Sequence, residues 1–113
     1  MSDKVDVLEK LAPFCRKAGV MVTGREKLAR MGGQLVFVMI TSDLSNNSRR
    51  EVLQRLPVPV VEYGTMEEIK RLFGLENAKI IGFKKNSLST QILEALKPFL
   101  VVRPPPPGPG REN

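Results

Sequence analysis

The chain has 113 residues, the length of one domain, and its hydrophobic fraction of 42% can build a core. It contains no histidine and one cysteine, Cys15, so an internal disulfide framework is excluded and the commonest general base and metal ligand is missing. No apolar run approaches the roughly 20 residues that cross a bilayer, and the N-terminal residues mix acids and bases, unlike a secretory signal. We expect a cytoplasmic protein that is not an enzyme and holds no metal ion or cofactor.

The charge balance is the first indication of function. Eighteen Lys and Arg residues against twelve Asp and Glu residues give a net charge of +6 and an isoelectric point near 9.8. A basic domain concentrates polyanions around itself, and an isoelectric point above about 9 is typical of nucleic-acid binding. Many small proteins are basic for solubility alone, so the charge by itself leaves both explanations open.

The first half of the chain alternates between helical and extended patterns. Apolar residues from Val5 to Cys15 recur at three- and four-residue spacing, which predicts a helix with one buried face. Pro13 should kink this helix or divide it into two pieces, and Gly19 should end it. We then expect a strand at 20–22, a helix that opens at a Thr23 capping box and runs to about Met31, a strand at 35–40 and a helix at 49–56.

The second half repeats this alternation. A strand is expected at 58–63, and Thr65 to Glu68 has the spacing of another capping box, which should open a helix that ends at Gly74. A strand at 79–83 follows, and then a helix that is capped by Asn86 or Ser87 and halted by Pro98. Helices that alternate with strands predict a layered α/β domain in which helices cover both faces of a sheet.

The composition changes abruptly beyond residue 102, where prolines and glycines dominate. We expect residues 1–102 to form the domain and residues 103–113 to be a disordered or polyproline II tail. Arg103, Pro106 and Pro109 fit an R-x-x-P-x-x-P pattern that docks into aromatic grooves, which would make the tail a ligand for a partner protein. Such matches arise easily in a proline run, so a passive end or linker is the favoured interpretation.

Few residues of the chain suit catalysis. Asp43 follows the expected strand at 35–40, and open α/β sheets bind small ligands at the carboxyl ends of their strands. The sequence shows no partner for Asp43, so a loop or capping role is favoured over a ligand site. Cys15 lies on the apolar face of the first helix, which indicates a buried structural thiol. Neither a P-loop nor a G-x-G-x-x-G motif occurs, so nucleotide binding has no support.

A basic segment lies between residues 16 and 30. Five cations minus the one acid, Glu26, leave a charge of +4; the cations are Arg16, Lys17, Arg25, Lys27 and Arg30. Gly24 would let a sugar-phosphate backbone approach closely, and the N–H groups at the start of the following helix suit phosphate oxygens. The cations would add the counterion-release part of the affinity. A capped surface helix with solvated charges explains the same spacing equally well.

Several segments resemble the kink-turn-binding ribosomal-protein superfamily, which includes the archaeal L-seven-Ae, L-thirty-e and S-twelve-e ribosomal proteins. The resemblance covers about residues 8 to 97 and is carried by 16–26, 35–42, 58–63 and 73–74. Its most specific parts are Gly19 and Gly24 ahead of a short helix, and the Val58-Pro59 start of a strand. The chain is most similar to the bacterial YlxQ-like branch, which also has an acid two residues after the second glycine.

The resemblance implies a three-layer α-β-α sandwich with a mixed sheet of about four strands. It also implies a ribosome-associated protein that binds structured RNA, such as ribosomal RNA or a kink-turn-like RNA. The contacts would come from the start of the second helix and from the loop before the last strand. On this chain the implied positions are Gly24, Arg25, Glu26, Lys27 and Arg30 in the helix, and Leu75, Glu76, Asn77, Ala78 and Lys79 in the loop.

Two of these positions differ from the archaeal pattern Gly-x-Asn-Glu, whose side chains recognise sheared G·A pairs. Glu26 takes the place of Asn, and Lys27 takes the place of Glu. Glu26 can cap its own helix or accept hydrogen bonds from a base edge, and capping is slightly favoured because it is local. Leu75 can pack against unstacked bases or cover the end of the core. The alternative to RNA binding is a protein–protein interaction module on the same fold that uses the proline-rich tail.

Overall fold

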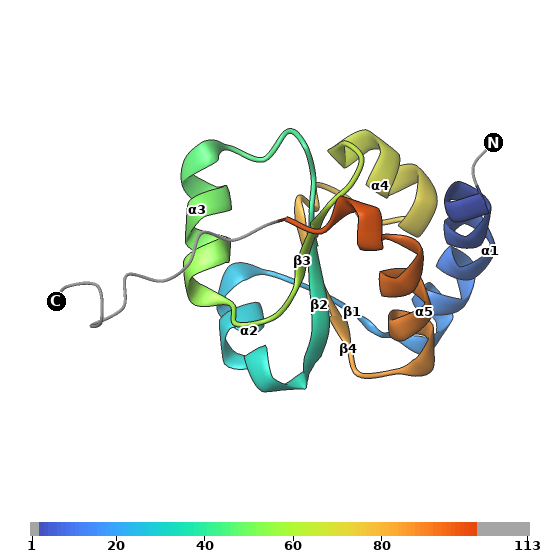
Figure 1. Ribbon diagram of the computed structural model, residues 1–113, viewed down its shortest axis with the longest axis horizontal. Coiled ribbons are helices and arrows are strands. Elements are labelled where there is room, and N and C mark those ends of the chain that lie inside the picture. The colour runs from blue at the N-terminus through green and yellow to red at the C-terminus, as the bar shows by residue number, and fades with distance from the viewer. Residues whose placement is uncertain (1–2, 102–113) are drawn as a thin grey trace, which may run out of the picture.

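The computed structural model describes residues 3–101, which form a four-stranded mixed sheet with helices on both faces (Figure 1). The strand order is β1-β4-β2-β3, with β1 (Met21–Thr23), β4 (Ile80–Lys84), β2 (Leu35–Ile40) and β3 (Val60–Glu62). Strand β4 is antiparallel to both of its neighbours, whereas β2 and β3 are parallel. The three-layer α-β-α sandwich that the resemblance implies is confirmed. The expected tail, with Arg103, Pro106 and Pro109, lies outside the described residues.

In this part of the chain, three helices cover one face of the sheet and two cover the other (Figure 1). The first face carries α1 (Asp3–Ala18), α4 (Met66–Phe73) and α5 (Ser87–Ala95). The second face carries α2 (Arg25–Arg30) and α3 (Asn46–Arg55). Short 3-10 turns lie at Gly32–Gln34 and Lys97–Phe99. None of the described helices is long and apolar enough to cross a membrane.

Each face has its own core, and β2 contributes to both. Phe37 of β2 stacks on Phe83 of β4 under the first face, with ring centroids 4.5 Å apart. Val38 of β2 packs with Leu28 of α2 and Val52 of α3 under the second face. Helices cover both sides of this strand, which explains its uninterrupted run of apolar residues, and the strand predicted at 35–40 is confirmed.

Two of the expected helix boundaries need correction. Helix α1 is one helix that continues through Pro13, so its division into two pieces is wrong. Pro13 is exposed, so water can bond the carbonyl that the missing N–H leaves free. Helix α3 begins at Asn46 rather than at residue 49, because the Ser45 hydroxyl accepts a hydrogen bond of 3.2 Å from the Ser48 N–H. The capping box at Thr65 is confirmed.

The capping box that the sequence suggests at Thr23 is wrong. Thr23 is the last residue of β1 and pairs with Ile81 of β4, so α2 starts one residue later, with Gly24 as its N-cap residue. Gly24 has a φ of 100°, which L side chains rarely adopt, and no side chain caps the helix. Glu26 therefore does not have the capping role that the sequence slightly favours. The helix has only six residues, so its dipole contributes little, and any attraction for anions must come from side chains.

Close packing at Gly82 holds α2 near the sheet. Gly82 lies in β4 between Val22 and Val38 of the flanking strands. A Cβ atom at this position would be 2.3 Å from Leu28 Cδ2 and 3.1 Å from Leu35 Cδ2. Leu28 is the buried residue of α2, so the missing side chain at Gly82 determines how closely the helix approaches the sheet.

Candidate nucleic-acid interface

Two segments that are far apart in the sequence meet at one end of the sheet. The antiparallel pairing of Thr23 with Ile81 brings the β1–α2 junction beside the loop that precedes β4. These segments and the start of α3 line one groove, which we call the junction groove. Its walls are residues 23–25, residues 76–80, and Leu44, Ser45 and Ser48. The groove therefore brings together six of the residues that the resemblance implicates in RNA contact. Four of them come from the loop and two from the helix start.

The cations of α2 lie at the surface. Lys27 stands beside the groove, because its Cβ atom is 4.0 Å from the place that a Cβ atom of Gly24 would occupy. Arg30 lines a neighbouring groove with Arg25, Glu26 and Arg55. Lys27 and Arg30 are exposed, and no acid within residues 3–101 forms an ion pair with either. Both charges are therefore available to a ligand.

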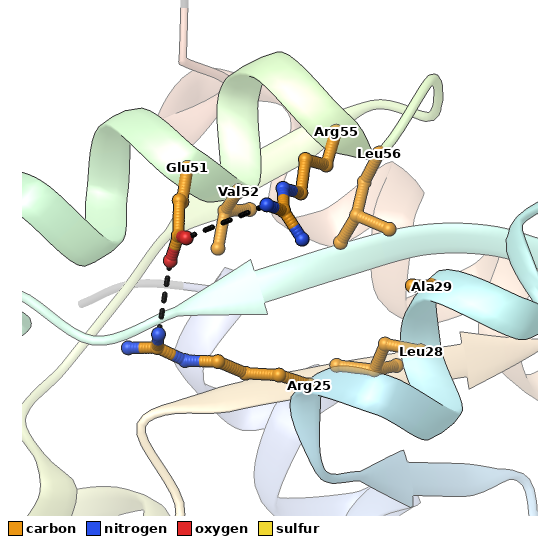
Figure 2. A pocket seen from close by; sticks show the side chains of 7 residues that line it. All are labelled: Arg25, Leu28, Ala29, Glu51, Val52, Arg55 and Leu56. Carbon is orange, nitrogen blue, oxygen red and sulfur yellow. Dashed lines mark hydrogen bonds and ion pairs between the residues drawn. The ribbon is translucent and has the colours of Figure 1, made fainter.

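Arg25 reaches across to α3, as Figure 2 shows. Its Nη1 atom is 2.9 Å from Glu51 Oε1, and its Nη2 atom donates to the Ser48 hydroxyl. Arg55 lies 3.9 Å from the other Glu51 oxygen. The pocket beside this bridge is apolar, with walls formed by Leu28, Ala29, Val52 and Leu56. Because the Arg25 and Glu51 side chains are 60% and 44% exposed, their pairing is worth about 0–1 kcal/mol, and a phosphate can compete for Arg25.

The sequence does not reveal the α3 side of this surface. Ser48 and Glu51 are remote from α2 in the chain, and only the packing of both helices on one sheet face brings them to Arg25. The one usable signal is the basic composition of α3. That signal is ambiguous, because Arg49 of the same helix turns to β3 and pairs with Glu62.

The loop before β4 contributes fewer free side chains than expected. Leu75 packs against the larger core and Ala78 is buried in it, so Leu75 covers the end of the core. Glu76 forms an ion pair of 3.5 Å with a lysine of α4. Asn77 makes the turn with a φ of 54°, a left-handed conformation that Asn tolerates. Exposed Asn77 and half-buried Lys79 remain as loop side chains that line the junction groove.

Arg16 and Lys17 do not line the junction groove. The guanidinium of Arg16 lies over Gly74 at the end of α4, where its Cζ atom would be 3.0 Å from an added Cβ atom. Lys17 is in the last turn of α1, next to Ala18 and Gly19, which line a separate groove. The five cations between residues 16 and 30 therefore do not form a single patch.

Asp43 and Cys15, the other residues with candidate chemistry, serve the fold. Asp43 lies in the turn after β2, which is the loop role that the sequence favours, and its Oδ2 accepts a hydrogen bond of 3.3 Å from the Met66 N–H at the start of α4. The Thr41 hydroxyl, and after it this N–H, hold the pKa of Asp43 below its ordinary value. Cys15 is buried, and burial raises the pKa of its thiol. Among residues 7–101, whose side chains the structure describes, no three Cys, Asp or Glu side chains are grouped so that they can hold a metal ion.

Solved structures share the fold of this chain, although no protein-family model and no curated protein sequence matches it. A protein of unknown function from Bacillus halodurans has a TM-score of 0.71 and 22% identity, over 80% of this chain and 96% of its own. The Giardia lamblia 15.5kD RNA binding protein has a TM-score of 0.62 and 14% identity, over 88% of this chain and 89% of its own. At these identities the likeness establishes a common fold.

Proposed function

We propose that this chain is a non-catalytic RNA-binding protein that holds structured RNA at the junction groove. The observation that carries the proposal is the meeting of residues 23–25 with residues 76–80 at one groove. Both segments resemble the RNA-contacting parts of the kink-turn-binding superfamily. The register of β1 on β4 places them side by side, as a shared binding surface requires.

The charges around the groove favour a phosphate backbone as the ligand. Lys27 is exposed beside it, and Lys79 lines it. Arg30 is exposed in the neighbouring groove that Arg25 also lines, and Arg25 can exchange Glu51 for a phosphate. Each cation that meets a phosphate releases condensed counterions and so adds to the affinity. Within the described residues no aromatic side chain lines this groove, so recognition relies on the shape of the RNA and on its backbone more than on stacked bases.

A bent or kink-turn-like RNA is the finer form of this proposal, and a cytoplasmic, ribosome-associated role goes with it. The Giardia lamblia neighbour is described as an RNA-binding protein, and a shared fold agrees with RNA binding by this chain. Lys27 stands where the archaeal pattern has an acid. A lysine has no acceptor for the guanine N–H groups that the acid of the archaeal pattern meets, so we expect affinity for a bent backbone with weak discrimination of sheared G·A pairs.

Reversing two charges tests the proposal. We expect Lys27→Glu with Arg30→Glu to abolish the electrophoretic shift of a kink-turn RNA at physiological salt, while weaker binding remains measurable at low salt. The slope of log affinity against log salt should fall by about 1.4–1.8, at about 0.7–0.9 for each lost phosphate contact. Both side chains are exposed, so the melting temperature should change little.

A matched control separates a local contact from the effect of net charge. Lys10→Glu with Lys97→Glu makes the same change in net charge on α1 and on the 3-10 turn that follows α5. This control should keep most of the RNA affinity and most of the salt slope. If the α2 variant binds the RNA as tightly as the control does, the junction groove is not the RNA site.

A further inference from the structure

A second groove lies near the other end of β4, and we call it the distal groove. Three segments line it: residues 18–20 at the end of α1, Gly33 and Gln34 after α2, and residues 84–86 at the end of β4. At a rise of about 3.3 Å per residue, Lys84 in this groove is roughly 13 Å from Ile80 in the junction groove. The two grooves therefore flank the short edge strand β1, with Val20 before it and Thr23 at its end.

Backbone hydrogen bonds hold the three segments of the distal groove together. The Lys84 N–H donates to the Val20 carbonyl at 2.8 Å, and the Lys85 N–H donates to the Gln34 carbonyl at 3.1 Å. The Asn86 side chain accepts from the N–H of Leu88 at 2.8 Å, so α5 supplies its own cap. Because the Asn86 side chain already takes the Leu88 N–H, we expect charged contacts to a ligand at this surface to come from side chains.

Unneutralised positive charge also marks this groove. Lys84 and Lys85 belong to its lining, Lys17 directly precedes it in the chain, and no acidic residue lines it. In the part of the chain that the structure describes, none of these three lysines forms an ion pair. On α2 the described Lys27 and Arg30 are likewise without ion pairs, whereas Arg25 and Arg55 share the charge of Glu51. Such a cluster attracts anions.

The distal groove also has open space next to its lysines. A Cβ atom added at Gly19 or at Gly33 would meet nothing within 4 Å. Gly33 does not have a positive φ, so the local backbone does not require glycine there. The missing side chains at these two positions leave room for a bulky, continuous ligand such as a sugar-phosphate backbone.

We propose that the distal groove is a second RNA-contact surface, at which Lys84 and Lys85 bind phosphates of a segment beyond the one held at the junction groove. This inference rests on the proposed function for the identity of the polyanion. An RNA that runs along the outer edge of β1 meets both grooves, because only roughly 13 Å of β4 separates them. The protein thereby grips the bend of the RNA and also one of its flanking arms.

The test compares two RNA probes, a kink-turn with short helical arms and the same kink-turn with one arm lengthened. The distal variant is Lys84→Gln with Lys85→Gln, and Lys10→Gln with Lys97→Gln is the control of equal net charge. On the long probe, the distal variant should lower the salt slope by about 1.4–1.8, for two lost phosphate contacts. When the salt rises from about 50 to 200 mM, both proteins lose affinity for the long probe. The fold loss of the distal variant should be about 7 to 12 times smaller than the fold loss of the unmodified chain. On the short probe, all three proteins should have the same slope.

The outcomes separate this proposal from the one on which it rests. If the distal variant and its control have equal slopes on the long probe, while Lys27→Glu with Arg30→Glu still abolishes the shift at physiological salt, the second surface is refuted and the junction groove stands. If the Lys27 and Arg30 variant binds like its own control, the proposed function fails. The proposal would also be overturned if the distal variant lost binding to an acidic protein while its salt slope for the long RNA probe was unchanged. The backbone hydrogen bonds of Lys84 and Lys85 persist in the distal variant, so its melting temperature should match that of its control.

Discussion

The packing of α2 on the sheet can be tested most sharply at Gly82. In Gly82→Ala the new Cβ atom would be 2.3 Å from Leu28 Cδ2, whereas carbon atoms in contact are about 3.5–4.0 Å apart. Overpacking a core costs about 1–3 kcal/mol, and an overlap of this size belongs at the upper end. Replacing a strand glycine by alanine returns about 0.5–1 kcal/mol. We therefore expect a net loss of about 2 kcal/mol, which lowers the melting temperature of a domain of this size by roughly 8 °C.

Urea denaturation followed by circular dichroism measures this loss, and a second substitution identifies its cause. Leu28→Ala alone should cost about 2–5 kcal/mol, because it leaves a cavity at a buried site. In the double variant the overlap between the new Cβ atom and Leu28 disappears. The loss of stability measured for the double variant should therefore be smaller than the sum of the losses of the two single variants. A strictly additive result, or a Gly82→Ala protein as stable as the unmodified chain, would refute the argument that Gly82 sets the position of α2.

Two further predictions concern titratable groups. Burial raises the pKa of Cys15 above its ordinary 9.0, so the stability that the thiol contributes is present below that pH and is lost as the pH rises through the raised value. The folded chain should react with a thiol reagent far more slowly than the urea-unfolded chain, and equal rates would show that Cys15 is accessible. The Thr41 hydroxyl, followed by the Met66 N–H, lowers the pKa of Asp43 below 3.8, so its contribution is present above that pH and is lost as the pH falls through the lowered value. As the pH is lowered, the midpoint of urea unfolding should fall less for Asp43→Asn than for the unmodified chain. An identical pH dependence of the two proteins would show that the Asp43 carboxylate does not stabilise the fold.

The layered fold can be predicted because most of its signals are local. The six apolar residues of β2 and the capping box at Thr65 each depend on neighbours in the sequence, and the structure has both. Thr23 has the same spacing to Glu26 as Thr65 has to Glu68, but it pairs with Ile81 and remains in β1. A local rule fails here because a long-range pairing competes for the same residue.

The candidate site can be predicted only in part, for the same reason. The resemblance locates Gly24 and the loop at 76–79, and the sheet register then brings them together. Nothing local indicates that Arg25 meets Glu51, because that contact depends on how two helices pack on one sheet face. Arg16 is close to this segment in the sequence but lies over the end of α4, since its position in α1 directs it there.

The pairing of Thr23 with Ile81 also links recognition to local stability. Strand β1 has three residues and pairs with the sheet on one side only. The junction groove takes one wall from each partner of this pairing, so it exists only while the edge strand is docked. Opening of this edge would erase the site while the rest of the sheet stayed intact. An RNA bound across the groove would stabilise the paired state of that edge, and its measured affinity would include the free energy of keeping the strand paired.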